Sequence, residues 1–134
     1  MNKTRVMVEF AIYGDNFDSN KITEMLNVPP TDTHIKGDPS KYKYHSYKET
    51  LWEYATGYKE SSDMNDQIKE ICDVFKDKTN TLNKIRNEYA VEIVVCIVIE
   101  IENGESPGMR LKPWFIDFSH EIHADIQFDI YFLS

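Results

Sequence analysis

Two of the four histidines, His120 and His123, lie three residues apart near the end of the chain, and Asp117 lies three residues before the first. Residues three apart share a helix face, so these side chains could bind a metal ion or exchange protons. The spacing differs from the His-Glu-x-x-His pattern of zinc enzymes, and the helix dipole also favours histidines at a helix C-terminus. We therefore favour a structural role for the pair and expect no metal site.

The run over residues 41–48 interleaves tyrosines with lysines. Aromatic rings can stack on bases while lysines pair with phosphates, so this run could contact a nucleotide or another anion. Lysines on an edge strand, where they prevent pairing with other chains, produce the same pattern. We favour the edge strand.

The loop over residues 31–38 contains Thr31, Lys36, Gly37 and Asp38, and Trp52 follows it. A lysine beside a glycine turn can bind an anion, and a tryptophan can form the floor of a pocket, so these residues are the candidate ligand-binding site. The alternative is structural. In that case Gly37 provides a backbone angle, Lys36 pairs with a neighbouring carboxylate and Trp52 belongs to the core.

Motifs of enzymatic chemistry are missing from the sequence, which has no phosphate-binding glycine loop and no Gly-x-Ser-x-Gly turn. Cys72 and Cys96 fall inside apolar patterns without a partner at metal-ligand spacing, so we expect buried free thiols in a reducing cytoplasm. We find no signal-type segment and no membrane-length apolar run. The expectation is a cytoplasmic protein with no catalytic residues and no cofactor.

The charge is strongly negative, with 15 Lys and Arg against 23 Asp and Glu, a formal net charge of −8. Binding of nucleic acid over the whole surface is therefore disfavoured, and a cationic partner is favoured. Most of the excess lies in the second half of the chain. Glu92, Glu100, Asp125 and Asp129 occupy the polar sides of two expected strands, which would form an acidic sheet face if the strands are neighbours. A merely solvated surface is the alternative.

Strands are predicted by alternating apolar residues over 5–13, 51–58, 90–102 and 125–132, with a short strand near 33–36. The 90–102 segment is apolar on both sides in its middle, which is typical of a central strand. On the strand over 51–58, Trp52 and Tyr54 share one face.

Helices are predicted over 19–26, from about 63 to 75, over 81–88 and from Pro113 onward. Asp18 can cap the first helix, and Ser61 or Ser62 can cap the second. The second helix has an apolar stripe of Met64, Ile68, Ile71, Cys72 and Phe75. The last helix has apolar residues near one face: Leu111, Phe115, Phe118 and Ile122.

This order of strands and helices predicts an α+β fold, a two-layer sandwich in which helices pack on one face of a mostly antiparallel or mixed sheet. Because a strand, a helix and a strand follow one another at both ends, a ferredoxin-like arrangement is one option. The length of 134 residues fits a single domain over residues 1–134.

Several short motifs in this order resemble one known family. They are Ile12-Tyr13-Gly14-Asp15-Asn16-Phe17-Asp18, Ile22-Thr23, Leu26, Pro30-Thr31, Lys36-Gly37-Asp38, Trp52 and Phe128-Asp129-Ile130-Tyr131. The chain resembles the bacterial domain of unknown function 4279 family over nearly its whole length. It departs at Asn27, where the family has glycine, although asparagine also tolerates a left-handed helix end. The resemblance implies a small bacterial α+β domain and transfers no active site.

Two functions remain. We favour a non-enzymatic protein-binding domain of immunity or inhibitor type, in which the acidic face meets a basic protein partner. The alternative is a domain that binds a small anionic ligand or nucleotide, with or without catalysis, through the 31–38 loop and Trp52.

Overall fold

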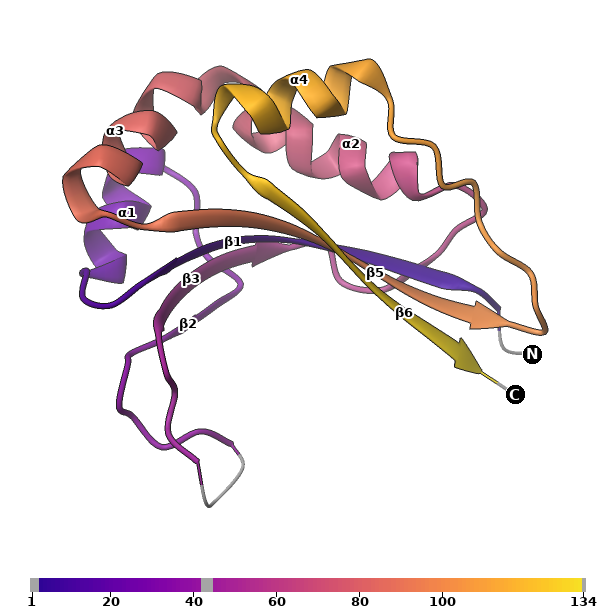
Figure 1. Cartoon of the computed structure of the whole chain (residues 1–134), viewed down its shortest axis with the longest axis horizontal. Helices are drawn as coiled ribbons and strands as arrows, with labels where there is room; N and C mark the ends of the chain where they lie inside the picture. The colour runs from indigo at the N-terminus through magenta and orange to yellow at the C-terminus, as the bar shows by residue number, and fades with distance from the viewer. Residues whose placement is uncertain (1–2, 42–44, 134) are drawn as a thin grey trace.

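The computed structural model describes residues 3–41 and 45–133 (Figure 1). Its elements, in chain order, are β1 (Arg5–Gly14), α1 (Ser19–Leu26), β2 (Asp32–His34), β3 (Thr50–Ala55), β4 (Lys59–Glu60), α2 (Met64–Phe75), a 3-10 turn (Lys76–Lys78), α3 (Thr79–Tyr89), β5 (Glu92–Glu102), α4 (Pro113–Glu121) and β6 (Asp125–Leu133). No helix in the described ranges is long and apolar enough to cross a membrane.

The strands form one mixed sheet in the order β2-β3-β1-β5-β6, with β4 pairing beside β3 on the start of β1. Neighbours run antiparallel except β5 and β6, which are parallel and joined through α4. The helices lie on one face of this sheet (Figure 1). The predicted two-layer α+β sandwich is therefore confirmed, and β5 lies between two strands, as its apolar middle predicts.

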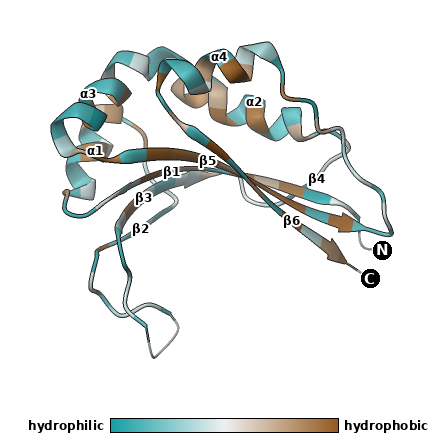
Figure 2. Cartoon of the chain, in the orientation of Figure 1, coloured by the Kyte–Doolittle hydropathy of each residue, from teal (hydrophilic) through white to brown (hydrophobic). Residues whose placement is uncertain are grey.

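The core lies between the sheet and the helices. From β1 and β5 it receives alternate side chains, among them Phe10 and Ile97, and both central strands are hydrophobic over much of their length (Figure 2). Phe10 stacks on Phe75 of α2 with ring centroids 4.0 Å apart, and the Trp52 ring meets Phe75 edge-on. Each large ring buried in this way contributes roughly 2–3 kcal/mol.

The ends of the first helix follow the sequence signals. Asp18 is the N-cap of α1, and its carboxylate accepts a hydrogen bond from the Asn20 backbone N–H. Asn27 ends the helix in the left-handed conformation, with φ 55°. Asparagine thus takes the place of glycine at a backbone angle that both residues tolerate.

The N-cap predicted for α2 is wrong by one or two residues. Asp63, not Ser61 or Ser62, caps the helix, because its carboxylate accepts a hydrogen bond of 3.0 Å from the Asn65 backbone N–H. The Ser61 hydroxyl is engaged in a local turn, where it donates to the Asp63 carbonyl. Both residue types can cap a helix, so only the backbone geometry decides between them.

Two other details differ from the sequence predictions. Leu111 precedes α4 and is exposed, whereas Phe115, Phe118 and Ile122 are buried as predicted. The two ends of the chain do not repeat one arrangement, because β1 and β3 are antiparallel while β5 and β6 are parallel. The sheet therefore lacks the internal repeat of a ferredoxin-like fold.

Candidate functional site

One face of the sheet carries no helix among the described residues, and we call it the open face (Figure 1). Successive side chains of a strand point to opposite sides, so residues that alternate with the core residues lie on this face. The β1–β5 register places Glu9 opposite Cys96 and Tyr13 opposite Glu92 on it. Its middle is apolar and largely buried, with Ala11, Cys96 and Val98 each under 9% exposed.

The four predicted acidic residues share this face. In the β5–β6 register Asp125 lies opposite Val94 and Asp129 lies opposite Val98. Glu92 and Glu100 alternate with core residues on β5 and so point to the same side. Within this register no two of the four carboxylates stand directly opposite each other, which limits their repulsion.

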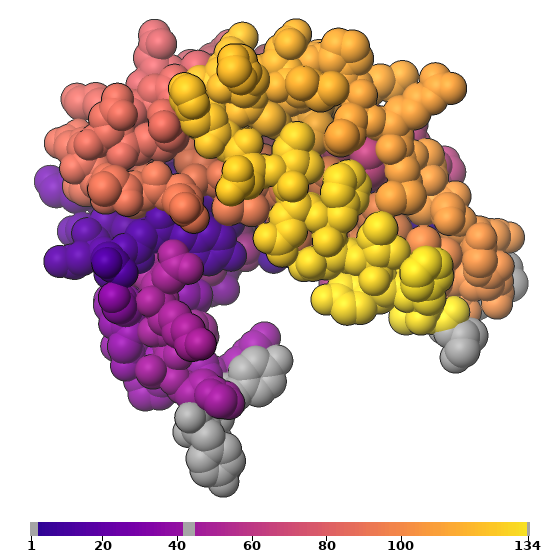
Figure 3. All heavy atoms as spheres, in the orientation of Figure 1, coloured from indigo at the N-terminus to yellow at the C-terminus, as the bar shows by residue number. Residues whose placement is uncertain are grey.

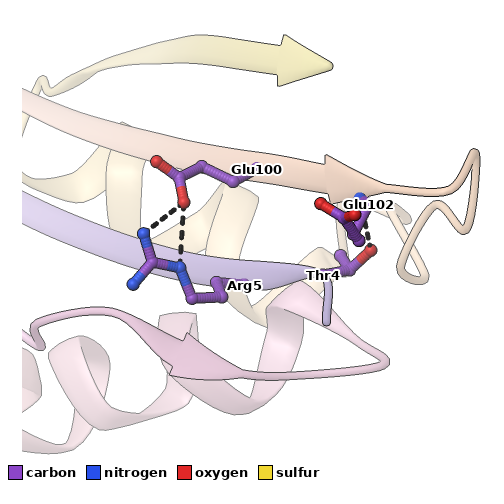
Figure 4. A network of polar contacts seen from close by, with 4 residues as sticks. All are labelled: Thr4, Arg5, Glu100 and Glu102. Atoms are coloured by element: carbon purple, nitrogen blue, oxygen red, sulfur yellow. Dashed lines mark hydrogen bonds and ion pairs between the residues drawn. The ribbon is translucent and has the colours of Figure 1, made fainter. Parts of the chain in front are cut away.

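Glu100 is already partnered (Figure 4). The guanidinium of Arg5 donates to Glu100 Oε1 through Nε at 2.9 Å and also through Nη2, and it lies 4.3 Å from the centre of the Tyr58 ring. Nearby, the Thr4 hydroxyl accepts a hydrogen bond from the Glu102 backbone N–H at 3.1 Å. Arg5 is the only lysine or arginine on the open face among the described strand residues, so Glu100 is the least available of the four carboxylates.

Asp129 forms contacts within the face. Its carboxylate accepts hydrogen bonds of 3.4 Å from the Cys96 thiol and from the Gln127 side-chain amide. Burial, followed by the bond to Asp129, raises the pKa of Cys96 to about 12. The thiol therefore stays protonated and unreactive at neutral pH.

A carboxyl cluster of Glu9, Glu53 and Asp32 lies nearer the β2 edge of the open face. Asp32 is the strand partner of Glu53, and Glu9 lies diagonally across from Glu53. Burial, the charge of Glu9, a hydrogen bond to Glu9 and the charge of Asp32 together raise the pKa of Glu53 to about 8. Burial and the charges of Glu53 and Glu9 raise the pKa of Tyr13 to about 12.

The sequence predictions missed this cluster. Glu9 alternates with the core residues of its strand, which is a usable signal for its side of the sheet. Glu9 comes close to Glu53 only because β1 and β3 are neighbours in the observed register. The two segments lie over forty residues apart in the sequence, and their apolar patterns do not reveal this register.

The predicted ligand loop does not converge on one pocket. Lys36 pairs with Asp15 at 2.8 Å, and Gly37 has a φ of 91°. Trp52 is fully buried, and its indole N–H donates to the Thr23 hydroxyl at 3.0 Å. These three residues match the structural alternative, and Trp52 is not available as the floor of a surface pocket.

The two remaining loop residues act on the backbone. The Thr31 hydroxyl accepts a hydrogen bond of 3.0 Å from the Ala55 N–H. Asp38 exchanges main-chain contacts with Ile35 and Tyr47. Thr31 thus holds the start of the loop to β3, and Asp38 holds its end to Tyr47.

His120 and His123 are exposed, with ring centroids 6.2 Å apart. α4 ends at Glu121, and His123 has a φ of 55°, so the second histidine lies beyond the helix and leaves the face shared by Asp117 and His120. Among the residues that the structure describes, no three or more His, Cys, Asp or Glu side chains are arranged so that they could hold a metal ion.

The lysine and tyrosine run is described only in part, because residues 42–44 lie outside the described residues. Tyr47 stacks on His34 with ring centroids 3.6 Å apart, at the edge of the open face. In the described part of the run, Pro39 and Ser46 form an isolated antiparallel bridge. The described flanks of this segment project from the sheet on the side away from the helices (Figure 1).

The family comparison covers nearly the whole chain. Residues 2–133 match the model of a family described as a domain of unknown function, DUF4279. No curated protein and no solved structure matches the chain. On the family match, the chain belongs to the DUF4279 family.

Proposed function

We propose that the chain is a non-enzymatic protein-binding domain of immunity or inhibitor type, which binds a basic protein through its open face. The observation that carries the proposal is the gathering of carboxylates on this face, where Glu9, Asp32 and Glu53 join the residues predicted from the sequence. Arg5 is the single lysine or arginine among the described strand residues there, and it is paired with Glu100.

The electrostatics of the carboxyl cluster favour a cationic partner. Glu53 keeps its proton at neutral pH because a second charge beside Glu9 in a half-buried position is unfavourable. A lysine or arginine placed between the two carboxyl groups would remove this repulsion and release the proton. Binding of a cationic group is therefore favoured by its attraction to both carboxylates, Glu9 and Glu53.

The arrangement of polar and apolar residues also supports the proposal. Met7 and Val94 are partly exposed near the middle of this face, beside the buried Ala11, Cys96 and Val98, while Glu92 and Asp125 are exposed towards one end of β5 and β6. Protein interfaces commonly combine an apolar centre with a charged, solvated rim. Charged rim residues accelerate association and restrict the choice of partner more than they add affinity.

The shape is consistent with docking of a convex partner. Figure 3 shows a hollow below the sheet, between the projecting segment that follows β2 and the β6 edge. A strand face that is flanked on one side by such a segment can surround part of a partner instead of meeting it on a plane.

The test is capture of partners from a bacterial lysate by the immobilised chain, followed by titration calorimetry with each purified partner. The double variant Glu92→Lys/Asp125→Lys reverses two exposed charges on the open face, and Glu24→Lys/Glu88→Lys reverses two exposed charges on the helix side. We expect a partner with a basic surface, bound at least roughly tenfold more weakly by the first variant and unchanged by the second.

Salt provides a second readout on the same partner. The affinity should fall when NaCl is raised from about 50 to 500 mM, because exposed charges are screened over a shorter distance. Equal binding by the two double variants, or binding that salt does not weaken, would contradict the proposal.

A further inference from the structure

β6 forms one outer edge of the sheet and has no strand beside it on its free side among the described residues. The strand is long, and its register with β5 continues without a bulge from Asp125 to Leu133. Proteins usually protect such an edge with lysine, proline, a bulge or a short strand. β6 contains none of these, whereas β2 at the opposite edge has only three residues.

The side chains of β6 are apolar and exposed. Phe128, Ile130 and Phe132 point to the helix side by their register with β5, yet they are 36%, 39% and 78% exposed. On the open face, Tyr131 and Leu133 are also exposed. The apolar residues of β6 alternate as they do in a strand that is covered by helices, but the helix layer leaves much of the second half of β6 uncovered.

The sequence of β6 is complementary to itself in a register that is centred on its exposed second half. When two copies run antiparallel and are centred on Ile130, Phe128 faces Phe132 of the second copy, and Asp129 faces Tyr131. A register centred on Asp129 would place two carboxylates opposite each other, which is unfavourable. We propose that β6 pairs in this way with β6 of a second copy of the chain, forming a symmetric dimer with one continuous sheet.

The charge distribution selects a second copy over a basic partner. Although each chain has a net charge of −8, residues 126–133 contain a single carboxylate, Asp129. A cationic partner would find little to pair with along this edge. In the centred register the Asp129 carboxylate can accept a hydrogen bond from the Tyr131 hydroxyl of the second copy, so the pairing joins complementary groups.

The exposed area is close to what a dimer requires. Taking roughly 200 Å² for each large side chain, the five exposed residues of β6 present roughly 500 Å² per chain. Ile116 lies on the side of α4 away from α2, because it is about 200° around the helix from Trp114, which lines a groove with α2. With Ile116 the two copies offer at most about 1,200 Å², the lower end of the range for stable interfaces.

This inference is independent of the proposed function. Figure 3 shows α4 and β6 together on the near face of the molecule, while the open face lies below the sheet. In the dimer the two open faces lie on the same side of the continuous sheet, and they stay uncovered except along β6, where Asp129, Tyr131 and Leu133 meet the second copy. Loss of the dimer therefore leaves the charged residues of the open face in place.

The first test measures mass by light scattering during gel filtration, over about 5 to 500 µM chain. We expect the wild-type mass to rise towards twice 15.7 kDa with concentration. Phe132→Lys introduces a lysine on each side of the interface, and at roughly tenfold each it should weaken the dimer about a hundredfold. Ile35→Lys, at an exposed apolar position outside β6, should leave the dimer unchanged. A wild-type chain that stays monomeric over the whole range would overturn the proposal.

The second test measures the register without adding a charge. In the centred register Ile130 faces its own copy, so Ile130→Cys should form a disulfide-linked dimer under mild oxidation. Leu133→Cys places the two thiols about six residues, or roughly 20 Å, apart and should not. The native cysteines are buried in both variants. Equal cross-linking of the two variants, or none of Ile130→Cys, would exclude this register.

Discussion

At the scale of single residues, Glu53 is the most perturbed side chain of the open face. It lies half-buried between Asp32 and Glu9, and burial is the largest cause of its raised pKa. A carboxyl group in such a position remains protonated at neutral pH and can donate a hydrogen bond. It therefore acts more like glutamine than like glutamate in the folded state.

This state predicts a specific dependence of stability on pH. The pKa of Glu53 rises from 4.5 to about 8 on folding, so the folded chain holds a proton that the unfolded chain releases in this range. The stabilisation that the proton on Glu53 gives to the folded state is fully present below about pH 4.5, and it is lost as the pH rises through about 8. Glu53→Gln should remove the loss, and at pH 9 it should raise the free energy of unfolding by about 1–2 kcal/mol, a value reduced for partial solvent screening.

The measurement is urea unfolding of both chains at pH 5, 7 and 9. Glu24→Gln, on the exposed side of α1, serves as the control and should follow the wild type at each pH. If the free energies of unfolding of the wild type and Glu53→Gln differed by the same amount at all three pH values, the proton on Glu53 would not be coupled to folding.

At the scale of secondary structure, most elements follow from local patterns. The bounds predicted from the period of two along β1 and from the apolar stripe of α2 agree with the observed bounds within a few residues. Local patterns do not decide which of several neighbouring residues caps a helix when each of them is able to do so. Ser61, Ser62 and Asp63 can each cap a helix, and the chain uses Asp63.

The cap can be tested by substitution. Asp63→Ala should lower the free energy of unfolding by about 1–2 kcal/mol, because the Asn65 backbone N–H loses its acceptor. Ser62→Ala is the matched control and should change it by less than about 0.5 kcal/mol, since Ser62 is exposed. Thermal unfolding followed by circular dichroism measures both. A larger effect of Ser62→Ala would show that the serine is the cap that stabilises α2.

At the scale of the whole molecule, the net charge of −8 opposes compaction. The surface ion pairs, such as Lys36 with Asp15 and Lys69 with Asp73, are exposed and offset little of the repulsion. The carboxyl cluster of the open face adds to it, because Glu9, Asp32 and Glu53 are held close together by the strands. A bound cationic partner would relieve the same repulsion.

Salt should therefore stabilise the fold at high pH. At pH 8, raising NaCl from about 10 to 200 mM should increase the midpoint of thermal unfolding, because screening weakens repulsion between like charges. Near pH 5, close to the isoelectric point of about 4.9, the increase should disappear. If NaCl raised the midpoint equally at both pH values, the net charge of the chain would not be the cause of the salt effect.

The candidate site could be predicted only in part. Asp125 and Asp129 alternate with apolar residues, so their side of the strand is readable from local pattern, and so is the low reactivity expected of Cys96. The pairing of Glu9 with Glu53 is not readable in this way. It depends on which strands are neighbours and in which register, and many registers bury the same apolar residues.

The amino-acid sequence by itself determined most of the elements, the α+β class, the family and the acidic character of the second half, because period, capping residues and charge are local properties. Only the tertiary structure decided that Trp52 is buried, that Lys36 is paired and that Glu53 shares a carboxyl cluster. It also decided that the apolar residues of β6 are left at an exposed edge. Burial and proximity are properties of the assembled layers, since a helix covers a strand only where the chain path brings it there.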